Sequence, residues 1–211
     1  MDIVEYVKEK PMREFSRGEI LLSKDDLITS LLVIRTGYVK VTSISESGVE
    51  RLIWIAGRYD ITPTEQLFSR SGSTQFFYTA LTDGTYFELD KNDFLAKASA
   101  EPQIMTEIAR SMSSHYDDFM SRLDAVDAAT IKERLLRTLY YLGQRVSADK
   151  EVDLLEYGLK LTHRDFAAMI GSTRETTSLT FSELRKENLI KYSRQQFIIY
   201  VDKIEAYLET I

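Results

Sequence analysis

The chain has 211 residues, of which 44% are hydrophobic and 28% charged, and it carries a formal net charge of -6 and no cysteine. This composition predicts one or two globular domains and argues against disorder. The longest apolar run, residues 27–34, is too short to cross a bilayer, and no signal segment opens the chain, so we expect a cytoplasmic protein without membrane contact. The lack of cysteine excludes disulfides, thiolate metal sites and cysteine-ligated iron–sulfur clusters.

Short runs rich in β-branched and aromatic residues, separated by glycines, fill residues 12–90. Such runs predict an antiparallel β-barrel or sandwich. Residues 45–50 and residues 82–84 are typical of hairpin turns. Aromatic side chains in these runs, among them Trp54 and Tyr59, either line an apolar pocket or fill the barrel, and filling is the preferred interpretation.

A short helix capped by Asp90 and a long helix from Pro102 to about Asp127 are predicted next. Apolar residues recur along the long helix at heptad spacing: Met105, Ala109, Met112, Tyr116, Phe119, Leu123 and Val126. A stripe sustained for three heptads predicts either packing on the chain's own barrel or the seam of a homodimer. We favour the seam, because a small barrel seldom covers the whole apolar face of so long a helix.

The pattern becomes helical and the charge balance changes near residue 129. Residues 1–129 hold 14 lysines and arginines against 21 aspartates and glutamates, whereas residues 130–211 hold 13 against 12. A helix starting at about Ile131 and a polar connector over residues 147–158 follow. We therefore expect an α+β protein in three parts: a barrel over residues 1–101, the long helix over residues 102–128, and a third part over residues 129–211.

Residues 161–190, LTHRDFAAMIGSTRETTSLTFSELRKENLI, predict two short helices around a tight glycine. Thr162 is a suitable N-cap for the first helix, with Asp165 three residues later as an acidic version of a capping box. Gly171 permits a left-handed turn, and Ser172 or Thr173 can cap the second helix. This pattern favours a helix-turn-helix over an ordinary helical hairpin with a solvated face.

The second helix has an apolar side and a polar side. If Thr177, Thr180, Phe181 and Leu184 face the core, then Arg174, Glu175, Ser178, Leu179 and Ser182 face outward. Arginine can donate two hydrogen bonds to guanine, and glutamate can accept one from cytosine, so the outward side suits base reading in a DNA major groove. Two strand-like runs over residues 188–202 add a β-hairpin, which predicts a winged helix-turn-helix with Lys191 and Arg194 near the DNA backbone.

This order of parts resembles the Crp/Fnr family, whose members combine a β-barrel effector domain, a long dimerisation helix and a winged helix-turn-helix. The segment Ser-Thr-Arg-Glu-Thr is similar to the family's DNA-reading motif. The resemblance implies that Arg174, Glu175, Ser178 and Leu179 face bases. It also implies that Thr162, His163, Arg164, Thr173 and Thr176 hold or lie beside the DNA backbone. Leu179 stands where the family commonly has a second arginine, which changes the expected DNA site.

The barrel departs further from the family's cyclic-nucleotide cassette. Asp60 persists, but Pro63 and Thr64 take the glycine and glutamate places, Thr74 takes the arginine place, and Gln75 follows it. The resemblance implies that this glutamate and arginine would bind the ribose and the cyclic phosphate. An anionic ligand at this degenerate cassette therefore lacks its charge partner, and we expect no binding of cyclic AMP.

The sequence thus predicts a cytoplasmic, homodimeric transcription regulator that binds double-stranded DNA, with RNA polymerase or another protein as a further candidate partner. The alternative is an effector-binding or protein-interaction module whose winged domain does not bind DNA, and Leu179 is the feature that supports it. We expect no enzyme, because no acid–base set, phosphate loop or nucleophile motif is present. We expect no cofactor and no metal, because the two histidines, His115 and His163, lie outside the barrel stretch; His115 is interpreted as a residue of the dimer interface.

Overall fold

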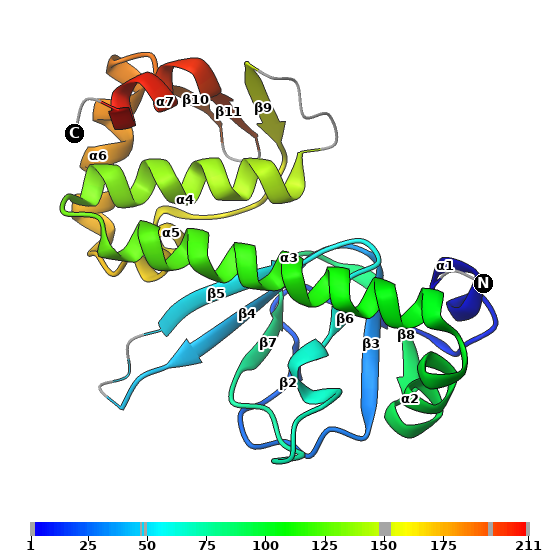
Figure 1. Cartoon of the computed structure of the whole chain (residues 1–211). Helices are drawn as coiled ribbons and strands as arrows, with labels where there is room; N and C mark the ends of the chain where they lie inside the picture. The colour runs from blue at the N-terminus through cyan, green and yellow to red at the C-terminus, as the bar shows by residue number, and fades with distance from the viewer. Residues whose placement is uncertain (1–2, 47, 49, 148–152, 194–195, 210–211) are drawn as a thin grey trace. The chain divides into compact units, whose positions relative to one another are not determined.

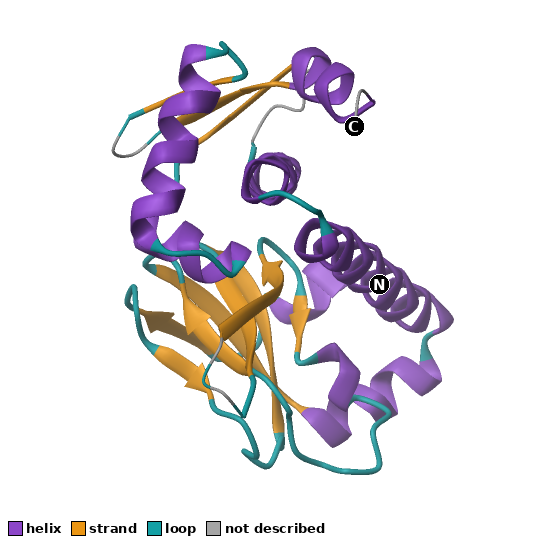
Figure 2. Ribbon diagram, turned by 90° about the vertical axis from the view of Figure 1, so that its left-hand side faces the viewer, coloured by secondary structure: helices purple, strands orange, loops and turns teal. Residues whose placement is uncertain are grey.

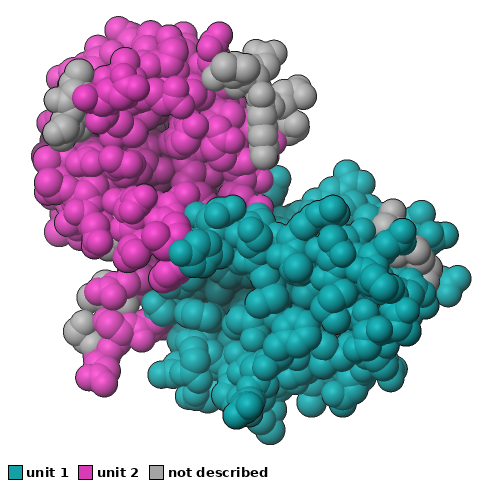
Figure 3. Space-filling view, in the orientation of Figure 1, with its two compact units in different colours: residues 1–43, 53–118 teal, residues 44–52, 119–211 magenta. Residues whose placement is uncertain are grey.

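The computed structural model describes residues 3–46, 48, 50–147, 153–193 and 196–209; the side chain of Val126 lies outside the description. The chain forms two compact units (Figure 3). Unit 1 comprises residues 1–43 and 53–118, and unit 2 comprises residues 44–52 and 119–211. The division falls inside the long helix, one turn before Arg122, rather than at its end.

Unit 1 is rich in antiparallel strands (Figures 1 and 2). Its strands are β1 (Met12–Phe15), β2 (Ile20–Leu22), β3 (Ser30–Thr36), β4 (Val39–Ile44), β5 (Glu50–Ala56), β6 (Ile61–Thr62), β7 (Phe77–Ala80) and β8 (Gly84–Asp90). The end of β4 and the start of β5 are counted to unit 2. They form two four-stranded sheets, in the orders β1-β8-β3-β6 and β2-β7-β4-β5. The helical elements are α1 (Ile3–Val7), the 3-10 turn η1 (Thr64–Gln66) and α2 (Lys91–Ala100).

Alternating apolar residues on these strands bury two hydrophobic clusters. One cluster contains Leu31, Val33 and Phe87, and the other contains Trp54 and Tyr78. Trp54 and Tyr78 therefore fill the barrel, as expected, whereas Tyr59 is partly buried. The predicted turn at residues 82–84 is not a hairpin, because β7 and β8 belong to different sheets and the chain crosses between them there.

The long helix α3 (Pro102–Asp127) follows α2, whose N-cap is Asp90 as predicted. Ile104 and Ile108 bury one side of α3 in the first barrel cluster. His115 lies on the same side, with its ring centroid 3.6 Å from that of Trp54 and its Nε2 atom 3.9 Å from an Asp60 carboxylate oxygen. The side chain of His115 therefore packs inside unit 1, and its place in a dimer interface stays a prediction.

Unit 2 contains α4 (Ile131–Val146), β9 (Leu154–Tyr157), α5 (His163–Ile170), α6 (Arg174–Lys186), β10 (Ile190–Tyr192), β11 (Phe197–Tyr200) and α7 (Val201–Glu209). The three strands form one antiparallel sheet in the order β10-β11-β9. The hairpin predicted over residues 188–202 is confirmed, because β10 and β11 pair antiparallel. The predicted polar connector over residues 147–158 is wrong in part, since Leu154–Tyr157 is a strand that buries Leu155 and Tyr157.

In the part of the chain that the structure describes, no helix has both the length and the apolar character needed to span a bilayer.

Candidate DNA interface

Helices α5 and α6 are joined by a turn whose local chemistry stops one helix and starts the next. Thr162 and Asp165 form a complete capping box at the start of α5. Gly171 ends α5 in a left-handed conformation with φ of 64°, which a residue with a side chain seldom adopts. Thr173 then caps α6 by accepting a hydrogen bond from the backbone N–H of Thr176 at 3.2 Å. The caps predicted from the sequence are confirmed.

A cluster of buried aromatic rings packs α5 and α6 against each other and against β11. Phe181 of α6 and Phe166 of α5 have ring centroids 5.0 Å apart, and Phe166 lies 5.4 Å from Phe197 of β11. All three rings are buried. Thr177 and Thr180 share this buried side, and each hydroxyl donates to a backbone carbonyl one turn earlier, at 2.8 and 2.9 Å. Both threonine hydroxyls are therefore buried without being left unsatisfied.

The opposite side of α6 faces solvent. Arg174 and Glu175, in the first turn, are exposed, and Leu179, one turn later, is 67% exposed. Single exposed leucines are common on protein surfaces, so this exposure shows only that Leu179 is accessible to a partner. The positive end of the helix dipole also lies at this first turn and favours a nearby phosphate.

Ser178 differs from its three predicted neighbours on the reading face. It is half-buried, and its hydroxyl lies 2.6 Å from Nδ1 of His163. The imidazole also stacks on Phe181, with centroids 4.6 Å apart. Burial, followed by the charge of Arg174, lowers the pKa of His163 below its ordinary value. His163 therefore positions α6 against α5, a contact that the helical periodicity of the sequence does not reveal.

The remaining predicted backbone contacts lie at the edges of this face. Thr162, Arg164, Thr173 and Thr176 are exposed, although the hydroxyl of Thr162 bonds to Asp165 at 2.8 Å and that of Thr173 bonds to Thr176 at 3.0 Å. Lys191 on the wing is exposed and lies over the ring of Tyr200, 5.6 Å from its centroid. Arg194 lies outside the described residues.

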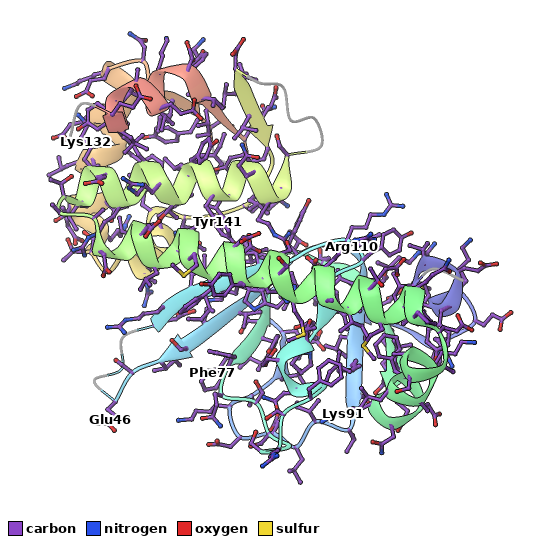
Figure 4. The ribbon with its side chains drawn as sticks, viewed as in Figure 1. Glu46, Phe77, Lys91, Arg110, Lys132 and Tyr141 are labelled. Atoms are coloured by element: carbon purple, nitrogen blue, oxygen red, sulfur yellow. The ribbon has the colours of Figure 1, made fainter. Side chains whose placement is uncertain are left out.

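A buried arginine fastens α3 to this domain. Arg122 is 2% exposed, and its guanidinium donates to the hydroxyl of Thr138 on α4 at 2.8 Å and to the carbonyl of Met169 on α5 at 3.0 Å. It also lies 5.6 Å from the ring centroid of Tyr141, a residue of α4 labelled in Figure 4. Burial lowers the pKa of Arg122 to about 10, which leaves it charged at neutral pH. Nothing in the sequence marks Arg122 as buried, because an arginine on a helix is usually solvated.

The predicted seam residues lie mostly on the exposed side of α3. Tyr116 is 62% exposed, and Met112, Phe119 and Leu123 are between 40% and 43% exposed; Ala109 is exposed as well. Met105 instead is half-buried and packs against the barrel cluster. Val126 cannot be placed on this stripe, because its side chain lies outside the description.

The degenerate cassette is filled by the protein's own side chains. Pro63, Thr64 and Thr74 are buried, whereas Gln75 is exposed and Asp60 accepts a hydrogen bond from the N–H of Gly57 at 2.7 Å. The carboxylate of Glu65 lies beside Thr74 and accepts hydrogen bonds from Tyr78 at 2.6 Å and from Thr74 at 3.4 Å. Burial raises the pKa of Glu65 above its ordinary value. An acid thus stands next to the position where the family cassette has an arginine.

An antiparallel barrel, a long helix and a winged helix-turn-helix with an exposed recognition helix define a DNA-binding transcription regulator. Two family models match the chain: the cyclic nucleotide-binding domain over residues 12–101 and the Crp-like helix-turn-helix domain over residues 133–206. The chain belongs to the Crp/Fnr family.

Individual relatives and solved structures agree with this assignment. The chain is 26% identical over 207 residues to the electron transport regulator A of Shewanella oneidensis, covering 98% of this chain and 79% of that protein. It is 24% identical to the fumarate and nitrate reduction regulatory protein of Yersinia pestis, covering 87% and 71%. The structure of FixK2 from Bradyrhizobium japonicum has the same fold, with a TM-score of 0.76, 14% identity and coverage of 93% and 96%.

Proposed function

We propose that the protein is a cytoplasmic homodimer that regulates transcription by reading a near-palindromic DNA site through the N-terminal turns of its two α6 helices. The observation that carries the proposal is the exposed pair Arg174 and Glu175 at the start of a helix whose other side is fully packed. RNA polymerase or another protein is the partner through which DNA binding changes transcription.

The three exposed reading residues have complementary chemistry. The guanidinium of Arg174 can donate two hydrogen bonds to O6 and N7 of guanine, and Glu175 can accept one from the amino group of cytosine. A carboxylate would otherwise be repelled by phosphates, so Glu175 favours sequence selectivity over general adhesion to DNA. Leu179 can pack on a thymine methyl group where the family commonly has arginine, which supports a site different from the family's usual one.

Backbone contacts would come from the rim of the reading face. Arg164 and Lys191 supply charge, and Thr162, Thr173 and Thr176 supply polar groups beside a helix N-terminus. Ser178 and His163 hold each other, so we assign them to the positioning of α6 before any contact with DNA.

The exposed stripe on α3 supports the dimer. Its apolar residues continue for several turns at heptad spacing, and exposed apolar stripes of this kind mark association surfaces. A two-fold axis along this stripe would present two copies of α6 to successive major grooves, about 34 Å apart.

The filled cassette supports a regulator that does not respond to cyclic AMP. A cyclic phosphate placed near Thr74 would meet the Glu65 carboxylate rather than a cation. Thr64 is buried, with its hydroxyl donating to the carbonyl of Ile61, so it offers nothing equivalent to a ribose-binding carboxylate.

Binding to a random duplex across a range of salt concentrations tests the proposal. We expect log K to fall steeply and linearly with log salt, because cations on the protein release counterions from DNA. Arg164→Ala should reduce the slope by about one and weaken all duplexes alike. Absence of binding to any duplex at low salt would instead favour a protein-interaction module.

A further inference from the structure

Two neighbouring cavities in unit 1 share lining residues, and neither lining includes Asp60, Pro63, Thr64, Thr74 or Gln75 of the cassette. The first, of about 330 Å³, is lined by residues that include Lys8, Lys10 and Phe87, and the second, of about 430 Å³, includes Arg58. Arg35 and Tyr59 line both cavities. We infer that this paired cavity is a binding site for a small organic anion that carries a phosphate group next to a planar or apolar body.

The cations supply the first part of the argument. Lys8, Lys10, Arg35 and Arg58 surround the two cavities, although residues 1–129 as a whole carry seven more acidic than basic residues. Across the described part of the chain, no ion pair joins any of these four side chains to a carboxylate. Four like charges gathered without carboxylate partners favour a bound anion, and arginine forks suit phosphate in particular.

The first cavity also has apolar side chains in its lining. Val4, Tyr59 and Phe87 belong to the barrel cluster or pack against it, and Phe87 is 8% exposed. A lining that combines cations with apolar side chains suits a ligand that has a charged end and an uncharged body. Both volumes are large enough for a small ligand, since small-molecule sites measure roughly 300–1,000 Å³.

Unusual backbone geometry places the two shared residues. Ile34 pairs with Tyr86 and Thr36 pairs with Thr85, so Arg35 is the extra residue of a β-bulge between β3 and β8. Bulges commonly redirect a side chain toward a functional site. Tyr59 has φ of 65°, a conformation rare for a bulky residue, and its N–H donates to the carbonyl of Ile34 at 2.6 Å.

The stacking of Arg58 completes the wall. Its guanidinium lies 4.9 Å from the ring centroid of Tyr59 and donates to the Tyr59 hydroxyl at 3.4 Å. Arg35 donates to the sulfur of Met12 at 2.9 Å, which holds it over the first cavity. The phosphate would lie between these two guanidinium groups, and the body of the ligand would lie against Tyr59.

Titration of the full chain with phenyl phosphate, in the absence of DNA, tests the inference by calorimetry. We expect saturable binding that Arg35→Gln weakens by roughly tenfold or more, because a charge-assisted contact is lost. Arg70→Gln removes the same charge from an exposed position outside the cavities and should leave the affinity within about twofold. Inorganic phosphate should bind more weakly than phenyl phosphate.

A second variant tests the ring. Tyr59→Asn removes the aromatic wall and keeps a residue that tolerates positive φ, so it should weaken phenyl phosphate by roughly threefold to tenfold and leave inorganic phosphate unchanged. If this variant does not fold, Arg35→Gln alone decides.

Equal effects of Arg35→Gln and Arg70→Gln, or no saturable binding of phenyl phosphate, would overturn the inference. Binding of a glutamate-rich peptide alone, lost in Arg35→Gln, would reassign the surface to a protein partner and also overturn it. None of these outcomes bears on DNA reading by α6.

Discussion

Two segments of the chain resemble ligand-contacting motifs of the Crp/Fnr family, and they differ in what their side chains can reach. Around Gly171, the residues that match the motif are exposed: Arg174 and Glu175 extend from a capped helix held by buried rings. Around Pro63, the matching positions are buried, and Glu65 is hydrogen-bonded to Tyr78 inside the barrel. A motif that retains exposed charges can still contact a ligand, whereas one that has become core contributes to stability.

The largest expected effect concerns the seam that would bring two reading helices together. Leu123→Glu should convert a dimer into a monomer and lower DNA affinity by about 10²- to 10⁴-fold, because the second half-site then binds independently. Sedimentation equilibrium and DNA titration measure the two effects. Ser121→Glu introduces the same charge at an exposed position on another side of α3 and should change neither. A dimer that survives Leu123→Glu would contradict the seam.

A change at Leu179 would sharpen the assignment of the reading face. Leu179→Arg restores the residue type common in the family and should change the preference at one base pair by about 1–3 kcal/mol. Competition between duplexes that differ at single positions measures this preference. Ala168→Arg adds the same charge to an exposed position of α5 and should tighten all duplexes slightly. Identical behaviour of the two variants would argue that Leu179 does not face bases.

The buried acid of the cassette should make stability depend on pH. Because the pKa of Glu65 is raised in the folded protein, its contribution is fully present below about pH 4.3 and is lost as the pH rises through the raised pKa. Glu65→Gln should remove this loss and stabilise the protein near neutral pH by on the order of 1 kcal/mol. Urea unfolding at several pH values measures the difference, with the exposed Glu14→Gln as the control. An unchanged pH profile would show that partial burial does not raise the pKa of Glu65.

The smallest effect is expected at His163 in the reading domain. Its pKa is lowered by burial and by Arg174, so its contribution to stability is present above about pH 6.5 and is lost as the pH falls through the lowered pKa. NMR titration should show His163 protonating at a lower pH than an exposed histidine, and the signal should be absent in His163→Gln. Protonation at a higher pH than usual would contradict the burial of the imidazole beside Arg174.

Local signals in the sequence were sufficient for the fold class and for the helix ends near Thr162, Gly171 and Thr173, because caps and turns depend on neighbouring residues. Features that depend on distant partners were not visible. The strand Leu154–Tyr157 forms only by pairing with β11, more than 40 residues later, and its flanking charges resemble a loop.

The two faces of α3 illustrate the same limit. Heptad spacing identified the exposed apolar stripe. Another face of α3 contains two polar residues that pack against aromatic rings: His115 contacts Trp54, and Arg122 lies over Tyr141. Neither contact can be read from the spacing. The bulge at Arg35 was likewise invisible, since it is defined by strand register with β8.

Selection of bound duplexes from a random pool is the sharpest test of whether Arg174 and Glu175 read bases. We predict that the wild-type protein enriches a near-palindromic sequence with half-sites about one helical turn apart. Arg174→Ala should lose the preference at one base pair in each half-site and keep the remainder. Enrichment of the same sequence by Arg174→Ala, or of no sequence by the wild type, would contradict the account.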